Sequence, residues 1–263
     1  MTLSRRAYID QPSPIQADLL ALFDRASRLV IFDVGSCEGE DSIRYARLFP
    51  SASIYAVEPL IANIRLIHAN LRRYACPGVR VVEKAFSDAP GRARFYVSSG
   101  RPPGIPSTVD WDYGNKSSSL LPPDQHLTVH PWVRFDEVVE VETGTLAQFC
   151  ASENIQGIDL LHLDVQGAEL KVLTGAGGML DRTKLVWLEV ERIPLYRGQP
   201  LADEVELFMT EHGFTKARQR VDLVSGDQLY LNAALVGGYP LTRRLRGRLR
   251  SMWRSAAARA AAE

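Results

Sequence analysis

The segment LVIFDVGSCEG at residues 29–39 contains the residue types that bind a nucleoside cofactor. Its apolar first half predicts a buried strand, which reaches an acid, Asp33, and then a turn with Gly35, Ser36 and Gly39. This G-x-x-x-G spacing differs from the G-x-G-x-x-G turn that cradles a dinucleotide diphosphate, and an acid ahead of the first glycine disfavours a polyphosphate. The acid suits instead a cationic cofactor with a free amino group. We therefore expect S-adenosylmethionine (SAM) to bind at this turn.

A second apolar segment, IYAVEP at residues 54–59, predicts the next strand and places Glu58 at its carboxyl end. A carboxylate at this position can accept hydrogen bonds from both ribose hydroxyls of a nucleoside. Asn63 lies one turn into the following predicted helix and is a further candidate for cofactor binding. At the preceding turn, we expect Asp33 either to reach the amino group of SAM or to organise the turn. We expect Gly35 to let the backbone approach the cofactor, since a Cβ atom there would collide with it.

Three carboxylates that end later apolar runs are candidates for catalysis. Asp164 ends the run at residues 158–164 (IDLLHLD), which predicts a buried parallel strand. Asp164 could act as a general base on a substrate hydroxyl, hold a divalent metal such as Mg²⁺ that does so, or only contact the methionine amino group of SAM. Glu189 and Glu191 end the run at residues 185–191 and lie on the same side of that strand, because strand side chains alternate. Either could join Asp164 in a substrate or metal site.

The elements that must position these residues alternate between strands and helices. This order predicts an α/β fold with a doubly wound, mostly parallel sheet. We expect the segments at residues 214–220 and 228–236 to close the sheet as an antiparallel pair. Residues 1–28 are a predicted helical extension, and residues 29–240 are the main domain. The predicted strands cover residues 29–34, 53–57, 79–83, 92–97, 135–142, 158–164 and 185–191, and the predicted helices cover residues 14–26, 39–48, 60–73, 145–153, 169–173 and 202–212.

Residues 98–125 form a segment rich in Gly, Pro and Ser that interrupts the alternation. A loop of this length inside a compact domain is usually functional. We interpret it as a lid or substrate loop that carries Trp111 and Tyr113. The alternative is a disordered surface insertion.

The formal net charge of the chain is zero, but residues 241–263 hold seven arginines and one acid, a net of +6, so the remaining residues carry −6. An acidic body argues against nucleic acid as the main partner. The tail at residues 241–263 predicts a basic amphipathic helix that could lie on an anionic membrane surface, or else a solvated or disordered tail. The start of the chain lacks the apolar core of a signal peptide, and no apolar run reaches the length of a membrane span. We expect a cytoplasmic protein, which the tail could bring to the inner face of the membrane.

Four sequence blocks resemble one family of enzymes. They are FDVGSCEG, YAVEP, SSSL and LLHLDVQGAELKVLTGAG. On these blocks, the chain resembles the FkbM-type class I SAM-dependent methyltransferases over roughly residues 30–235, which implies a Rossmann-like sheet of seven strands. The chain differs from the usual family pattern at three positions. It has Gln166 where Glu is usual, His162 where lysine is common, and Cys37 where Asn is frequent.

The resemblance implies O-methylation, often of a sugar hydroxyl on a natural product or glycolipid, and thus a small-molecule or glycan acceptor. It also implies that the adenine of SAM rests beside Phe86, Ser87 and Asp88, although these residues could instead form a simple turn. Two other functions stay open. One is an N-methyltransferase that acts on a small amine or peptide, and the other is a non-catalytic module that binds SAM or uses the fold as a scaffold.

Overall fold

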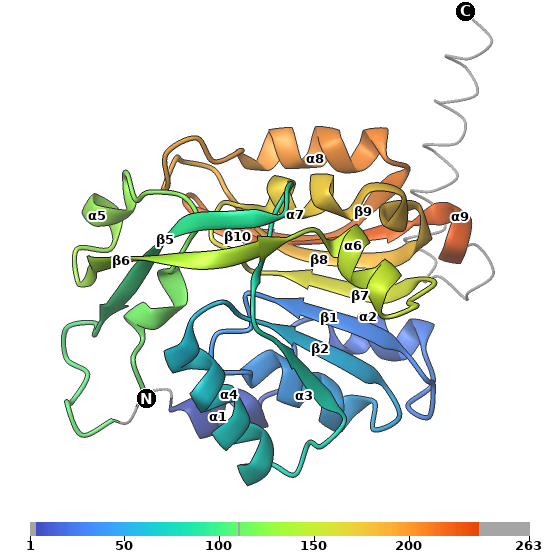
Figure 1. Cartoon of the computed structure of the whole chain (residues 1–263), viewed down its shortest axis with the longest axis horizontal. Helices are drawn as coiled ribbons and strands as arrows, with labels where there is room; N and C mark the ends of the chain where they lie inside the picture. The colour runs from blue at the N-terminus through green and yellow to red at the C-terminus, as the bar shows by residue number, and fades with distance from the viewer. Residues whose placement is uncertain (1–3, 110, 237–263) are drawn as a thin grey trace, which may run out of the picture.

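The computed structural model describes residues 4–109 and 111–236 and is built around a seven-stranded sheet (Figure 1). Its strands are β1 (Val30–Val34), β2 (Ser53–Val57), β3 (Val79–Val82), β7 (Ile158–Leu163), β8 (Thr183–Glu191), β9 (Phe214–Val221) and β10 (Ser225–Asn232). They lie in the order β3-β2-β1-β7-β8-β10-β9. Neighbours from β3 to β8 pair in parallel, whereas β10 runs antiparallel to both β8 and β9. The predicted α/β fold, with a mostly parallel sheet and an antiparallel closing strand, is confirmed.

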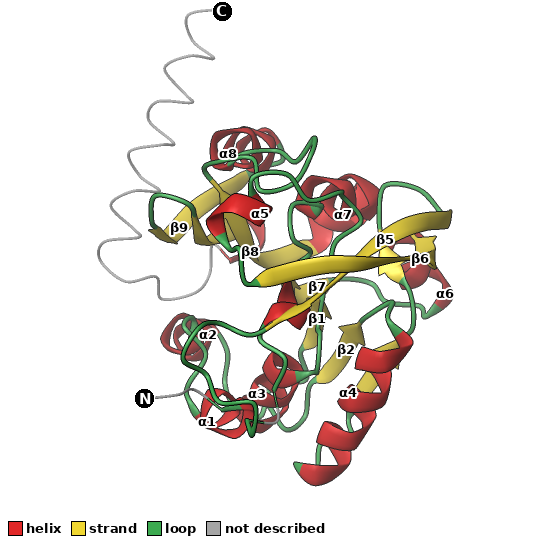
Figure 2. Cartoon of the chain, turned by 90° about the vertical axis from the view of Figure 1, so that its left-hand side faces the viewer, coloured by secondary structure: helices red, strands yellow, loops and turns green. Residues whose placement is uncertain are grey.

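Helices cover both faces of this sheet (Figures 1 and 2). Because strand side chains alternate between faces, Ile31 of β1 packs into one hydrophobic core and its neighbour Phe32 packs into the other. Strands that are covered on both faces must be apolar along their length, which explains the continuous apolar runs in the sequence. The first core includes residues of α1 (Arg5–Asp10), α2 (Gln16–Leu22), α3 (Glu40–Leu48), α4 (Ile61–Arg73) and α9 (Ala233–Val236). The second includes residues of α6 (Leu146–Ser152), α7 (Glu169–Ala176), η2 (Gly177–Arg182) and α8 (Ala202–Glu211).

A smaller sheet of three strands, in the order β4-β6-β5, follows β3 along the chain. It consists of β4 (Ala85–Phe86), β5 (Gly91–Gly100) and β6 (Val133–Gly144), and β5 and β6 pair as a long antiparallel hairpin. Their connection contains η1 (Gly114–Ser117) and α5 (His126–Val129). Two backbone hydrogen bonds, of 2.8 and 3.1 Å, join Ser119 of this connection to Tyr96 of β5. The Gly-, Pro- and Ser-rich segment is thus folded back against the small sheet.

The amino-terminal region differs from its prediction. The structure has two short helices, whereas the sequence pattern indicated one helix over residues 14–26. Ser4 caps α1 by accepting a hydrogen bond from the Ala7 amide at 3.2 Å. Pro12 and Pro14 separate α1 from α2, because proline lacks an amide hydrogen and disfavours helix in the residue before it.

Residues 241–263, where the sequence predicts a basic amphipathic helix, lie outside the described residues. Among the helices of the described ranges, none is long and apolar enough to cross a membrane.

Candidate functional site

The turn after β1 is in close contact with both neighbouring strands. The amides of Gly35 and Ser36 donate to the Val57 carbonyl of β2 at 3.0 and 3.1 Å. On the other side, a Cβ atom on Gly35 would lie 1.9 Å from the carbonyl oxygen of Asp164, the residue after β7, and Gly35 has a φ of +82°. Glycine is therefore required at this position because a side chain would collide with the protein backbone. The sequence analysis had instead expected a collision with the cofactor. Gly39, with a φ of 81°, is the N-cap of α3 and packs on Ile67 of α4.

A pocket that is partly open to solvent lies at the carboxyl ends of β1, β2 and β7. Parallel α/β sheets bind ligands at this edge, where the strand order reverses between β1 and β7. Five of the sequence-predicted site residues line the pocket together: Gly35, Glu58, Asn63, Phe86 and Asp164. Lys84, Ala85, Phe95 of β5, two residues of η1 and two residues of the segment after it belong to the same lining.

Glu58 is held rigidly at the end of β2. Its carboxylate accepts one hydrogen bond from the Cys37 amide at 3.1 Å and one from the Leu60 amide at 2.9 Å. The residue is only 4% exposed, and burial raises its pKa to about 7 even though these hydrogen bonds favour the charged form. Each carboxylate oxygen can still accept a further hydrogen bond, because it has two lone pairs. Glu58 is thus preorganised to accept two hydroxyl donors from the pocket.

Asp33 is not among the residues that line this pocket. It is 2% exposed, accepts a hydrogen bond from the Ser42 hydroxyl of α3 at 2.6 Å, and lies 3.1 Å from Nδ1 of His162 on β7. Burial opposes a charged imidazole, but the hydrogen bond and charge of Asp33 raise the pKa of His162 to about 9. The pair of Asp33 and His162 therefore joins β1 to β7 below the turn, and Ser42 joins the same carboxylate to α3.

Four other predicted cofactor residues, Ser36, Gly39, Ser87 and Asp88, also lie outside the pocket lining. The Ser36 hydroxyl is buried and has no hydrogen-bond partner among the described residues. The Ser87 hydroxyl donates to Asp88 at 2.9 Å, and Asp88 forms an ion pair with Lys171 of α7 at 3.1 Å. The residues that line the pocket on this side are their predecessors Ala85 and Phe86. An apolar wall of this kind suits the face of a planar base.

Two of the three predicted catalytic acids, Asp164 and Glu189, meet around one amide side chain. Gln166 donates through Nε2 to Asp164 at 2.8 Å and to Glu189 of β8 at 2.5 Å. Its Oε1 atom lies 2.9 Å from the Tyr196 hydroxyl, which also lies 2.7 Å from the Ser117 carbonyl. The structure thus brings Asp164 and Glu189 together, with Gln166 between them.

Burial dominates the electrostatics of this acidic group. It raises the pKa of Glu189 well above its usual range, and the charges of Asp164 and Glu191 raise it further. Burial and Asp164 raise the pKa of Glu191 to about 8. Burial also raises the pKa of Asp164, against the opposing effects of Gln166 and His162. A carboxylate with a raised pKa is a stronger base than an ordinary surface carboxylate.

The acids do not form a recognisable metal site. Within the described ranges, no group of three or more His, Cys, Asp or Glu side chains is arranged so that it could hold a metal ion. A divalent metal such as Mg²⁺, one of the alternative roles considered for Asp164, is not tested by this arrangement.

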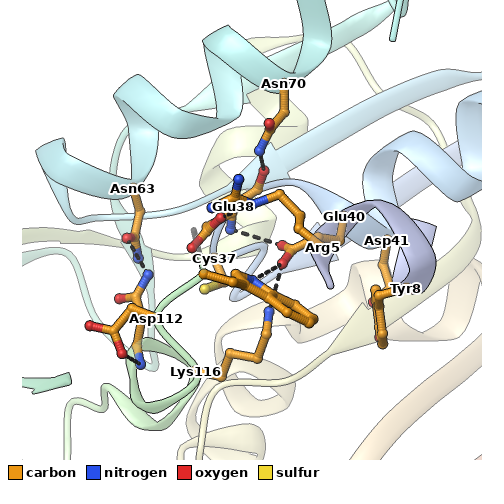
Figure 3. Close-up of polar contacts among 12 residues, drawn as sticks. Arg5, Tyr8, Cys37, Glu38, Glu40, Asp41, Asn63, Asn70, Asp112 and Lys116 are labelled. Carbon is orange, nitrogen blue, oxygen red and sulfur yellow. Dashed lines mark hydrogen bonds and ion pairs between the residues drawn. The ribbon is translucent and has the colours of Figure 1, made fainter. Parts of the chain in front are cut away.

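The segment predicted as a lid forms one wall of the pocket. Asn115 donates to Asn63 of α4 at 2.8 Å (Figure 3). Lys116 donates to Glu40 at the start of α3 at 2.7 Å, and the Trp111 indole donates to the same carboxylate oxygen at 3.1 Å. The segment is therefore fixed to α3 and α4, the two helices that follow β1 and β2.

The sequence analysis missed several residues of this wall and of its support. Asn115, Lys116, Ser118 and Leu120 line the pocket, although no local pattern marks them as ligand residues. The available signals are regional: all four lie in the predicted lid segment, Ser118 and Leu120 belong to the SSSL block of the family resemblance, and Asn115 and Lys116 directly precede that block.

The chain is similar to several known proteins. The family model described as the methyltransferase FkbM domain matches residues 33–216 of this chain. The 2-O-methyltransferase NoeI of Sinorhizobium fredii is 34% identical over 210 residues, which are 78% of this chain and 80% of that protein. The 31-O-demethyl-FK506 methyltransferase FkbM of Streptomyces tacrolimicus is 28% identical over 220 residues, with coverage of 78% and 80%.

A solved structure shares the fold. The structure of methyltransferase FkbM from Methylobacillus flagellatus KT has a TM-score of 0.50 and 13% sequence identity to this chain. The likeness covers 87% of this chain and 50% of that one, so this chain spans half of its length.

Proposed function

Because the chain belongs to the methyltransferase FkbM domain family and is a methyltransferase, we propose that it transfers the methyl group of SAM to a hydroxyl of a sugar-containing acceptor. The observation that carries this proposal is the placement of Glu58 and Asp164 in the lining of one pocket. A carboxylate at the end of β2 suits a ribose. A basic carboxylate at the end of β7 suits a hydroxyl nucleophile.

The donor set of the pocket fits SAM from one end to the other. The apolar wall at Ala85 and Phe86 would hold the adenine, and the carboxylate of Glu58 would accept both ribose hydroxyls. The part of the pocket that is lined by Gly35, Cys37 and Asp164 is left for the methionine part. When bound, SAM supplies a methyl group on a positively charged sulfur.

Asp164 would take up the proton of the acceptor hydroxyl. SAM would supply the methyl group, and the electron pair of the carbon–sulfur bond would remain on sulfur when that group passes to the hydroxyl oxygen. The protein must align the two reacting atoms and give the proton a destination. Gln166 orients the Asp164 carboxylate for this role, and the raised pKa of Asp164 favours proton transfer to it.

The names of two relatives favour oxygen as the methylated atom. NoeI is named a 2-O-methyltransferase, and the Streptomyces tacrolimicus protein is named for 31-O-demethyl-FK506. These names support a small-molecule or glycan hydroxyl as the acceptor of this chain.

A radiometric assay tests the proposal. The purified protein is incubated with methyl-tritiated SAM and a panel of methyl glycosides, and the labelled products are identified by mass spectrometry and methylation analysis. We expect O-methylated glycosides, and a loss of about 100-fold or more in rate for Asp164→Asn. Asp136→Asn is the matched control, because the Asp136 side chain is 73% exposed on β6. Methylation of an amine panel but not of any glycoside would contradict the proposal.

A further inference from the structure

Lys116 is a cation that the segment after β5 brings to the turn of the cofactor pocket. It lines the pocket together with Gly35, Cys37 and Asp164. Its ammonium group donates to Glu40 at 2.7 Å and lies 4.9 Å from the centre of the Trp111 ring. The side chain is still 34% exposed, and Figure 3 shows it reaching toward Glu40 beside Cys37. Lys116 is therefore held in place without being enclosed.

The contacts of Lys116 keep it charged. Burial opposes its charge, but Glu40 and other neighbours raise the pKa of Lys116 well above its ordinary value. An ammonium group has three N–H donors, and the hydrogen bond to Glu40 uses one of them. Lys116 can thus donate to an anionic group in the pocket while it stays bound to Glu40.

The strand order places the two ends of SAM. Residues 84–86 follow β3, Glu58 ends β2, Gly35 follows β1 and Asp164 follows β7, and these strands lie in the order β3-β2-β1-β7. If Glu58 holds the ribose and Phe86 the adenine, the methionine part must extend toward β1 and β7. Its α-carboxylate would then lie at the end of the pocket where Lys116 stands.

We propose that Lys116 binds the α-carboxylate of the methionine part of SAM. This inference rests on the proposed function, since it assumes that SAM occupies the pocket. The acids of the pocket, Glu58 and Asp164, suit hydroxyl groups and the positively charged sulfur, but they would repel a carboxylate. The other lysine that lines the pocket, Lys84, donates to Glu142 at 2.6 Å and lies at the end of the pocket proposed for the adenine. Lys116 therefore matches the one anionic group of the cofactor.

The same lysine could instead serve only to fix the wall of the pocket to Glu40. A pair of ligands separates these two roles. S-adenosylhomocysteine (SAH) has the α-carboxylate, and its decarboxylated analogue, 5′-deoxy-5′-(3-aminopropylthio)adenosine, retains the adenosine and the amine but lacks the carboxylate. Both ligands are titrated by calorimetry into the wild type, Lys116→Met, Lys116→Arg and Lys84→Met.

We expect Lys116→Met to weaken SAH binding by about 10- to 100-fold, the loss typical of a charge-assisted hydrogen bond. The affinity for the decarboxylated analogue should change by less than about 2-fold, because a residue that contacts only the carboxylate does not affect the binding of a ligand that lacks this group. Lys116→Arg should retain most of the SAH affinity. Lys84→Met should change both affinities by the same factor.

Equal weakening of both ligands by Lys116→Met, or no weakening of either, would overturn the inference. Equal weakening would mean that Lys116 acts by holding the wall in place. Failure of the wild type to bind SAH at all would instead overturn the proposed function. Thermal unfolding of each variant identifies any that has lost its fold, and Lys116→Arg then decides the question.

Discussion

The carbonyl oxygen of Asp164 lies 1.9 Å from the point that a Cβ atom on Gly35 would occupy. The turn that follows β1 and the residue that follows β7 are therefore in direct backbone contact, and no side chain can separate them. This contact fixes the distance between the glycine turn of the pocket and its candidate base. A side chain at position 35 must displace the end of β7 or unfold the turn.

We expect Gly35→Ala to destabilise the protein by roughly 3 kcal/mol or more, because it combines a backbone collision with a positive φ. Urea unfolding followed by circular dichroism measures this change. Gly178→Ala is the control, since a Cβ atom there would meet no atom within 4 Å. The control should change stability by no more than about 0.5 kcal/mol. Equal stability of the two variants would contradict the contact between Gly35 and Asp164.

His162 should make stability fall as the pH rises above neutrality. Its pKa is raised to about 9 in the folded protein, so the folded state keeps this proton to a higher pH than the unfolded chain does. The contribution of His162 to the free energy of unfolding is complete below about pH 6.5 and is lost as the pH rises through about 9. The shift in its pKa corresponds to about 3 kcal/mol.

The test of this prediction is urea unfolding of the wild type and His162→Gln between pH 6 and pH 9.5. The difference in free energy of unfolding between the wild type and the variant should decrease across this range. His68→Gln, at an exposed position of α4, should show the same pH dependence of the free energy of unfolding as the wild type. A constant difference between the wild type and His162→Gln would show that the Asp33 carboxylate does not hold a proton on the imidazole.

Gln166 should offset the repulsion between two buried carboxylates, those of Asp164 and Glu189. Its amide donates one hydrogen bond to Asp164 and one to Glu189. Replacement by Met removes both donors, and the loss should cost about 1–3 kcal/mol at pH 8. The cost should be smaller at pH 5.5. At that pH the folded variant binds more protons than its unfolded chain does, which relieves the repulsion between the two carboxylates. The stability of the variant therefore falls as the pH rises.

Urea unfolding at the two pH values checks the effect of Gln166→Met. Gln156→Met provides the comparison, since Gln156 is exposed. A cost for Gln166→Met that is the same at pH 5.5 and pH 8 would mean that the amide only fills space between the carboxylates.

The fold and the central part of the pocket could be predicted from local sequence. Long apolar runs that end in an acid have few alternatives to buried parallel strands, so Glu58 and Asp164 could be placed at the same edge of the sheet. The positions of Asp33 and Ser87 within that edge could not be predicted in the same way. Both lie next to lining residues, Val34 and Phe86. Within a strand or tight turn, one step along the chain turns a side chain to the opposite side.

The wall formed by Asn115 and Lys116 depends on contacts that are distant in sequence. Lys116 meets Glu40 across 76 positions, and Asn115 meets Asn63 across 52. The segment that carries them is rich in Gly, Pro and Ser, and its composition indicates a loop but not the surface on which it packs. The two long strands of the small sheet could be predicted, at residues 92–97 and 135–142, but the surface on which the segment between them packs could not.

The central claim is that Glu58 holds SAM at the carboxyl end of β2, and calorimetric titration tests it most directly. SAM and SAH are titrated into the wild type, Glu58→Ala and Glu211→Ala, the last being an exposed position on α8. We predict binding in the micromolar range for the wild type and Glu211→Ala, and a loss of about 100-fold or more for Glu58→Ala. Absence of heat and of any thermal shift with both ligands in the wild type would contradict the account, as would unchanged affinity in Glu58→Ala.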